Sequence, residues 1–143
     1  MSGTMALLQE ARRRELEQVL FYRLLAWGAA RACDTMAAER LHELLADEQH
    51  HVSRLTARIL ELGGAPAAAG REPPPPPSLG GWEVEARTRE VAEVTWYENA
   101  LAGEQDPETR SLLGEILDSE RHHREDLAGK WMPAGPTTAK EDM

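Results

Sequence analysis

The chain reads ELLADEQHH at residues 43–51 and EILDSERHH at residues 115–123, so one pattern occurs twice with an offset of 72 residues. Each copy contains Glu-x-x-His, at residues 48–51 and 120–123. Side chains three residues apart lie on the same face of a helix. Leucine, isoleucine and valine flank both pairs, which indicates that this face points into a core. A single pair of this kind is common by chance, whereas two matched copies predict a shared role.

A second pattern precedes each copy. The segment ARRRELEQVLFY at residues 11–22 aligns with ARTREVAEVTWY at residues 86–97, which places Glu15 opposite Glu90. Apolar residues follow both glutamates at helical spacing, and a tyrosine stands seven residues after each of them. The sequence therefore predicts an internal duplication in which each half carries one glutamate followed by one Glu-x-x-His.

The hydrophobic periodicity predicts an all-α protein with four helices, at about residues 4–31, 35–62, 82–102 and 107–131. Asp34 and Asp106 are expected N-caps, and Pro107 occupies the first helical position after Asp106. Short connections within each half favour antiparallel hairpins. We assign residues 1–132 to this helical domain and expect the polar residues 133–143 to be a disordered tail.

The two hairpins are joined by residues 65–81, which include five consecutive prolines at 73–77 and cannot be helical. A polyproline segment rises ~3.1 Å per residue, so about fifteen residues cover ~45 Å. A helix of about 27 residues is ~40 Å long, so this linker can cross a whole bundle. A tether between two independent hairpins is the alternative, but it leaves the apolar stripes of both hairpins in water.

Composition narrows the functional class. The 143 residues carry a formal net charge of −9, which argues against a nucleic-acid or anionic-membrane ligand and favours cations. Cys33 is the only cysteine, so the chain cannot form an internal disulfide or a cysteine-based metal site by itself. No apolar run approaches the length of a membrane span, and no signal-peptide pattern is recognisable, so we expect a cytoplasmic protein.

Four carboxylates and two histidines inside one helical core need counterions, because each unpaired buried carboxylate is driven to hold its proton. Two divalent cations balance four carboxylates, with the histidines as neutral donors. A glutamate from each of two helices and Glu-x-x-His from each of the other two is the ligand pattern of dinuclear carboxylate bundles. The predicted metal ligands are Glu15, Glu48, His51, Glu90, Glu120 and His123.

At these residues the chain resembles the ferritin-like superfamily, and within it the rubrerythrins and bacterioferritins. The resemblance covers the four predicted helices. It implies a ferritin-like four-helix bundle with two iron ions, although manganese or zinc fits the same ligands. It also makes Glu93, one turn after Glu90, a candidate additional ligand, for which a solvent-facing position is the alternative. Which of Glu90 and Glu93 is the main ligand stays open at this point.

Departures from the family patterns refine this picture. The residue after Glu48 is Gln49, where bacterioferritins carry the haem-ligating methionine, so we expect no haem. No fifth helix follows residue 131, which favours a homodimer or small homo-oligomer over a storage cage. The cysteine-rich module of full-length rubrerythrins is missing, so electrons are expected to come from a separate protein.

The resemblance implies an oxidoreductase that reacts with peroxide or dioxygen. Three alternatives stay open: an iron-handling ferroxidase without a cage, a hydroxylase of an organic substrate, and a metal-free interaction module. Tyr22 and Tyr97 are candidate catalytic residues that bond a ligand carboxylate or pass an electron, with core packing as the alternative. His42, His50 and His122 are expected on the surface, and so is the arginine run at residues 12–14.

Overall fold

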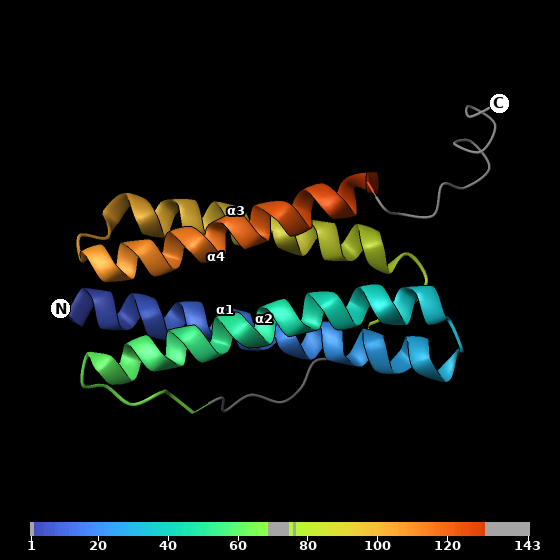
Figure 1. Cartoon of the computed structure of the whole chain (residues 1–143), viewed down its shortest axis with the longest axis horizontal. Coiled ribbons are helices and arrows are strands. Elements are labelled where there is room, and N and C mark those ends of the chain that lie inside the picture. The colour runs from blue at the N-terminus through green and yellow to red at the C-terminus, as the bar shows by residue number, and fades with distance from the viewer. Residues whose placement is uncertain (1, 69–74, 76, 131–143) are drawn as a thin grey trace.

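The computed structural model describes residues 2–68, 75 and 77–130, and within them the chain forms two antiparallel helical hairpins (Figure 1). The helices are α1 (Ser2–Arg31), α2 (Thr35–Glu61), α3 (Trp82–Gly103) and α4 (Pro107–Glu125), followed by the π-helical turn η1 (Asp126–Lys130). The predicted all-α four-helix bundle is confirmed. The expected tail at residues 133–143 and the prolines at 73, 74 and 76 lie outside the described residues.

Side-chain caps and a glycine explain where the helices begin and end. The carboxylate of Asp34 accepts a hydrogen bond from the Ala37 amide at the start of α2. The carboxylate of Asp106 accepts one from the Thr109 amide at 3.0 Å, at the start of α4. These bonds satisfy amides that have no partner inside the helix. Gly63, just after α2, has a φ of 86°, a left-handed conformation that glycine adopts without a steric cost.

The connection between the hairpins joins opposite ends of the bundle. Figure 1 shows that α2 ends and α3 begins at opposite ends of the molecule, as the long crossover requires. The side chain of Gln9 on α1 holds the start of the connection, donating to the Ala65 carbonyl oxygen at 2.8 Å and accepting from the Ala67 amide at 3.0 Å. The crossover is therefore anchored along α1 where it leaves α2.

Polar bonds join one hairpin to the other. Arg58 on α2 donates to Asp106, immediately before α4, at 2.7 Å, and Arg14 on α1 pairs with Glu93 on α3 at 3.0 Å. Together with the shared core, these contacts contradict the alternative of two independent hairpins on a tether.

The apolar core is divided into two parts by a polar layer. One cluster contains Leu55, Ile59 and Leu113 near the start of α1 and α4, and the other contains Leu25, Leu41 and Leu127 towards the opposite end. Between them lie buried polar side chains: Glu15, Gln18, Glu48, His51, Glu90, Glu120 and His123. A polar layer in the middle of a bundle costs desolvation energy, so it points to a site rather than to packing.

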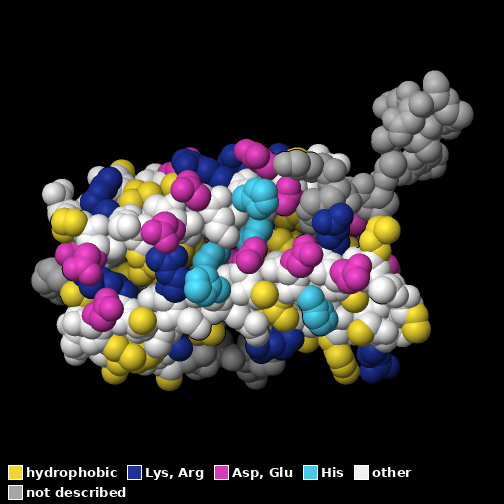
Figure 2. Space-filling model, viewed as in Figure 1, with side chains coloured by type: hydrophobic (Ala, Val, Ile, Leu, Met, Phe, Trp, Pro, Cys, Tyr) yellow, Lys and Arg dark blue, Asp and Glu magenta, His cyan; other side chains and the backbone are white. Residues whose placement is uncertain are grey.

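The outer surface is highly charged. Figure 2 shows acidic and basic side chains along the whole visible face. None of the described helices is both long enough and apolar enough to cross a membrane.

Replacing Leu113 by alanine should lower the free energy of unfolding by about 2–5 kcal/mol, because this fully buried side chain fills the first cluster. Leu60→Ala is the matched control, since Leu60 is 57% exposed and its truncation should change stability by less than about 0.5 kcal/mol. Urea unfolding of metal-free protein measures both values. Equal effects of the two substitutions would contradict the assigned core.

Candidate metal centre

The polar layer brings together the six residues that the sequence predicted as ligands. They come from all four helices: Glu15 from α1, Glu48 and His51 from α2, Glu90 from α3, and Glu120 and His123 from α4. Each is at most 4% exposed. Their surroundings are apolar on both sides along the bundle axis, so bulk water does not solvate these charges.

The six side chains form two overlapping groups of four, and within each group one ligand atom per residue lies within 4.8 Å of the others. Position A is defined by Glu15, Glu48, His51 and Glu120. Position B is defined by Glu48, Glu90, Glu120 and His123. Glu48 and Glu120 belong to both positions, so their carboxylates stand where ligands that bridge two metal ions would stand.

Tyrosines from each hairpin fix a carboxylate of the other hairpin. Tyr22 on α1 donates to Glu90 Oε2 on α3 at 2.6 Å, and Tyr97 on α3 donates to Glu15 Oε2 on α1 at 2.6 Å. Both tyrosines are fully buried. Burial, reinforced by the nearby carboxylates, raises the pKa of both phenols well above their usual range, so they stay protonated donors.

Several buried ligand atoms have no hydrogen-bond partner among the described residues. They are Glu48 Oε2, Glu90 Oε1, both carboxylate oxygens of Glu120, and His123 Nδ1. Buried polar atoms are nearly always bonded, and an exception needs an explanation. Carboxylate oxygens and an imidazole nitrogen are a donor set for divalent iron, manganese or zinc. The residues present therefore fit a pair of such ions.

The burial of the cluster also determines the pKa values of its carboxylates. Burial and the mutual repulsion of the carboxylates raise the pKa of Glu48 and of Glu120 well above the usual range. Burial acts in the same direction on Glu15, but hydrogen bonds and the charge interaction with His51 leave the pKa of Glu15 lowered. Without metal, the cluster therefore keeps protons as its counterions at neutral pH.

His123 is held by a carboxylate that sequence reasoning missed. Its Nε2 atom lies 2.8 Å from Asp47 Oδ2, while its Nδ1 atom lies 3.2 Å from Glu120 Oε1. Burial alone would lower the pKa of His123, but Asp47, Glu120 and Glu90 raise it to about 12. A carboxylate on the outer nitrogen of a ligating histidine fixes its tautomer and orientation. Asp47 precedes Glu48 on α2 and its partner is on α4, so no local pattern marks it.

Glu93 belongs to neither group of ligands. It lies one turn after Glu90, and its carboxylate accepts two hydrogen bonds from Arg14, at 3.1 and 3.0 Å. Burial, together with the charges of Glu15 and Glu90, raises the pKa of Glu93 to about 7 against the opposing effect of Arg14. The expectation that Arg14 faces solvent is wrong, because its side chain is 21% exposed and paired across the bundle.

Gln18 is a second residue that sequence reasoning missed. It is 1% exposed, and its side-chain amide lies 3.4 Å from Glu90 Oε2. By contrast His42, His50 and His122 are exposed, as expected. Figure 2 shows histidine side chains crossing the middle of one face between acidic groups. This row marks where the buried layer approaches the surface.

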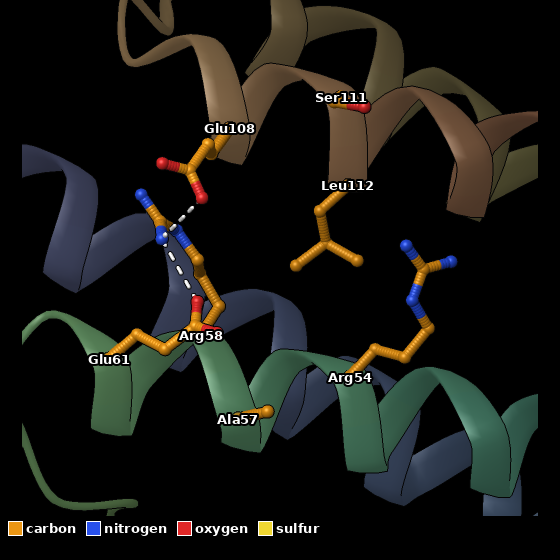
Figure 3. A pocket seen from close by; sticks show the side chains of 7 residues that line it. All are labelled: Arg54, Ala57, Arg58, Glu61, Glu108, Ser111 and Leu112. Carbon is orange, nitrogen blue, oxygen red and sulfur yellow. Dashed lines mark hydrogen bonds and ion pairs between the residues drawn. The ribbon is translucent and has the colours of Figure 1, made fainter.

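A hollow of about 330 Å³ lies elsewhere, between α2 and α4 (Figure 3). Its charged lining is already engaged: Arg58 pairs with Glu61 and Glu108, and Arg54 pairs with Glu115. None of the residues that line it belongs to position A or position B. The hollow is thus a polar surface feature separate from the metal centre.

Solved structures that are similar to this chain include two bacterioferritin-related proteins. One is the bacterioferritin of Desulfovibrio desulfuricans, described with its diiron site in different catalytic states, which is 21% identical with a TM-score of 0.81 over 89% of this chain and 77% of the other. The second is a dodecameric thioferritin, the bacterioferritin-related protein of Bacteroides fragilis, also 21% identical, with a TM-score of 0.77 over 99% of this chain and 90% of the other. No curated protein matches the chain.

At this level of identity the two structures establish a shared fold and no more. The family model of the ferritin-like domain matches residues 5–130, which include all four helices and every residue of the metal centre. The protein therefore belongs to the ferritin-like domain family.

Proposed function

We propose that this protein is a di-iron oxidoreductase of the rubrerythrin-like kind that reacts with hydrogen peroxide or dioxygen. The observation that carries the proposal is the convergence of six buried candidate ligands on two positions, where several of their oxygen and nitrogen atoms have no hydrogen-bond partner among the described residues. Four carboxylates balance the charge of two divalent ions, and the two histidines add neutral donors.

Each residue has a defined part in holding the ions. Glu48 and Glu120 reach both positions, Glu15 and His51 complete position A, and Glu90 and His123 complete position B. When bound, the two ferrous ions supply two electrons to peroxide or dioxygen. The buried tyrosines orient Glu15 and Glu90 through their hydrogen bonds, and Asp47 orients His123. The apolar clusters on either side keep bulk water from the ligands.

Two kinds of partner follow from this proposal. A separate electron-donor protein returns electrons to the ions, because one cysteine cannot supply an iron–sulfur site in this chain. A second copy of the chain is the other partner. The Bacteroides fragilis relative is described as dodecameric and this chain covers 90% of it, so we include homo-oligomers larger than a dimer in the proposal.

Iron handling is the second candidate function. The similarity to a bacterioferritin favours it, because that protein is described by its diiron site in catalytic states. In this case the same six ligands bind ferrous ions transiently, and dioxygen oxidises them before the ions leave. The two candidates differ in how many ions pass through each chain and in which oxidant reacts faster.

Anaerobic loading with ferrous iron should give about two irons per chain, one for each position. Glu48→Ala and Glu120→Ala should each abolish stoichiometric binding, because these carboxylates serve both positions. Glu39→Ala, at an exposed site on α2, is the control and should keep two irons. Colorimetric iron determination after desalting measures the content. Unchanged iron in both bridging variants would remove the site assignment.

Mixing the loaded protein separately with peroxide and with dioxygen distinguishes the candidates. Fast peroxide turnover with a constant iron content supports the oxidoreductase. Preferential reaction with dioxygen, together with uptake of more than two irons per chain, supports iron handling instead.

Metal binding should release protons and become tighter as the pH rises. Glu48, Glu120 and His123 have raised pKa values in the metal-free protein, so protons occupy them at neutral pH and compete with metal. Each proton displaced makes the dissociation constant fall about tenfold per pH unit, up to the pKa of the group. Zn²⁺ competition titrations between pH 6 and 8 measure this slope. A dissociation constant independent of pH would show that the ligands are already deprotonated.

Substituting either tyrosine by phenylalanine should weaken one position selectively. Tyr97→Phe frees Glu15 and affects position A, whereas Tyr22→Phe frees Glu90 and affects position B. Loss of a bond that orients a ligand costs about tenfold in metal affinity. Stepwise Co²⁺ titration resolves the two positions, and each variant serves as the control for the other. Wild-type affinity in both variants would assign the tyrosines to packing alone.

A further inference from the structure

The internal duplication of the sequence appears in the structure as matched contacts across the bundle. Residues 75 positions apart make equivalent bonds: Tyr22 donates to Glu90, and Tyr97 donates to Glu15, both at 2.6 Å. The two hairpins therefore face each other around the metal centre with an approximate two-fold relation. Any difference between equivalent residues then distinguishes position A from position B.

One such difference lies one turn beyond each helix glutamate. Gln18 follows Glu15 by three residues and Glu93 follows Glu90 by three, so a neutral amide in one half corresponds to a carboxylate in the other. Each has an arginine from the opposite hairpin. Arg89 donates to Gln18 Oε1 at 3.3 Å, and Arg14 donates to both oxygens of Glu93.

The arginines also occupy equivalent surroundings. Arg14 stacks over the ring of Trp96 at 5.2 Å, and Arg89 stacks over the ring of Phe21 at 4.0 Å. Both guanidinium groups are thus positioned by an aromatic ring next to the metal centre. What differs is the group that they hold across the bundle: Arg14 holds the Glu93 carboxylate, whereas Arg89 holds the Gln18 amide and lies 3.8 Å from the Glu85 carboxylate of its own helix.

The Gln18 side chain shows how close a side chain at this place in the repeat comes to the candidate ligands. Its amide nitrogen comes within 3.4 Å of the Oε2 atom of Glu90, a residue of position B. Glutamate and glutamine have the same length, and the repeat places Glu93 beside Glu15 as it places Gln18 beside Glu90. A Glu93 carboxylate released from Arg14 is therefore long enough to approach position A.

We propose that Arg14 is a positioning residue that withholds the Glu93 carboxylate from position A, and that breaking this ion pair gives position A an additional carboxylate ligand. The inference rests on the proposed function only in requiring that position A binds a metal ion. As a consequence, only position A can gain an additional carboxylate ligand, because Gln18, the equivalent residue near position B, is an amide. The alternative is an ion pair that merely joins α1 to α3.

Co²⁺ binding to the full chain tests the proposal without any turnover. Arg14→Met removes the charge but keeps much of the side-chain length, so it should strengthen binding at one position by about tenfold. It should also weaken the visible absorption bands of bound Co²⁺, which lose intensity as the coordination number rises. The matched control is Arg89→Met at the equivalent site, which should change neither the bands nor the affinity by more than about threefold.

A double variant separates ligation from long-range charge. In Arg14→Met/Glu93→Gln the gain in affinity and the spectral change should both vanish, because the released group can no longer bind as a carboxylate. A gain that persists in the double variant would overturn the proposal in favour of simple repulsion by Arg14. Identical behaviour of Arg14→Met and Arg89→Met would overturn it in favour of a structural ion pair.

Two further controls keep the test decisive. Arg14→Lys replaces Arg14→Met if the latter fails to fold. Lysine preserves the positive charge but cannot form two parallel bonds with Glu93, so we expect a smaller gain in Co²⁺ affinity in the same direction. Wild-type protein that binds no Co²⁺ would contradict the proposed function and this inference together. Wild-type protein that binds two Co²⁺ while both arginine variants match it would contradict this inference alone.

Discussion

Burial of four carboxylates in the middle of a helical bundle is the constraint on which the rest of this structure depends. Glu15, Glu48, Glu90 and Glu120 are fully buried, and a bundle of this size cannot hold four negative charges there without counterions. In the metal-free protein, protons and the charged His123 offset them. Two divalent cations would balance these charges and would also give partners to the oxygen and nitrogen atoms that lack a hydrogen bond among the described residues.

The same constraint links the metal centre to the tertiary fold. Each position takes ligands from both hairpins: position A adds Glu120 to three residues of α1 and α2, and position B adds Glu48 to three residues of α3 and α4. Metal ions bound there would hold the hairpins together, as a ligand that binds only the folded state does. The tyrosine bonds act in the same sense, since each crosses between hairpins. The two apolar clusters do not form one continuous core, because the layer of candidate ligands lies between them.

The sequence predicted the fold and the grouping of the candidate ligands because both follow from the spacing of residues along single helices. Glu-x-x-His is a pattern within one helix, and its repetition with a matching upstream glutamate implies convergence. The supporting residues were not predictable in this way. Asp47 and Arg14 act on partners 76 and 79 residues away, so their roles depend on how the helices pack. Arg14 in particular stands in an arginine-rich run that is typical of a solvent-exposed face, and its contacts with Glu93 and Trp96 on α3 distinguish it.

Duplication explains why the site is nearly symmetric, and the two halves differ in the residues that surround the candidate ligands. Each half supplies three of the six candidate ligands, and they match in pairs: Glu15 with Glu90, Glu48 with Glu120, and His51 with His123. The residues that neighbour these candidate ligands do not all match between the halves. At two of these neighbouring positions the halves differ in charge, because Gln18 corresponds to Glu93 and Ser119 corresponds to Asp47. Glu93 is held by Arg14 of α1, whereas Asp47 holds the histidine of position B. Two ions bound in otherwise equivalent ligand sets would thus experience different electrostatic surroundings, a difference that the ligands alone do not provide.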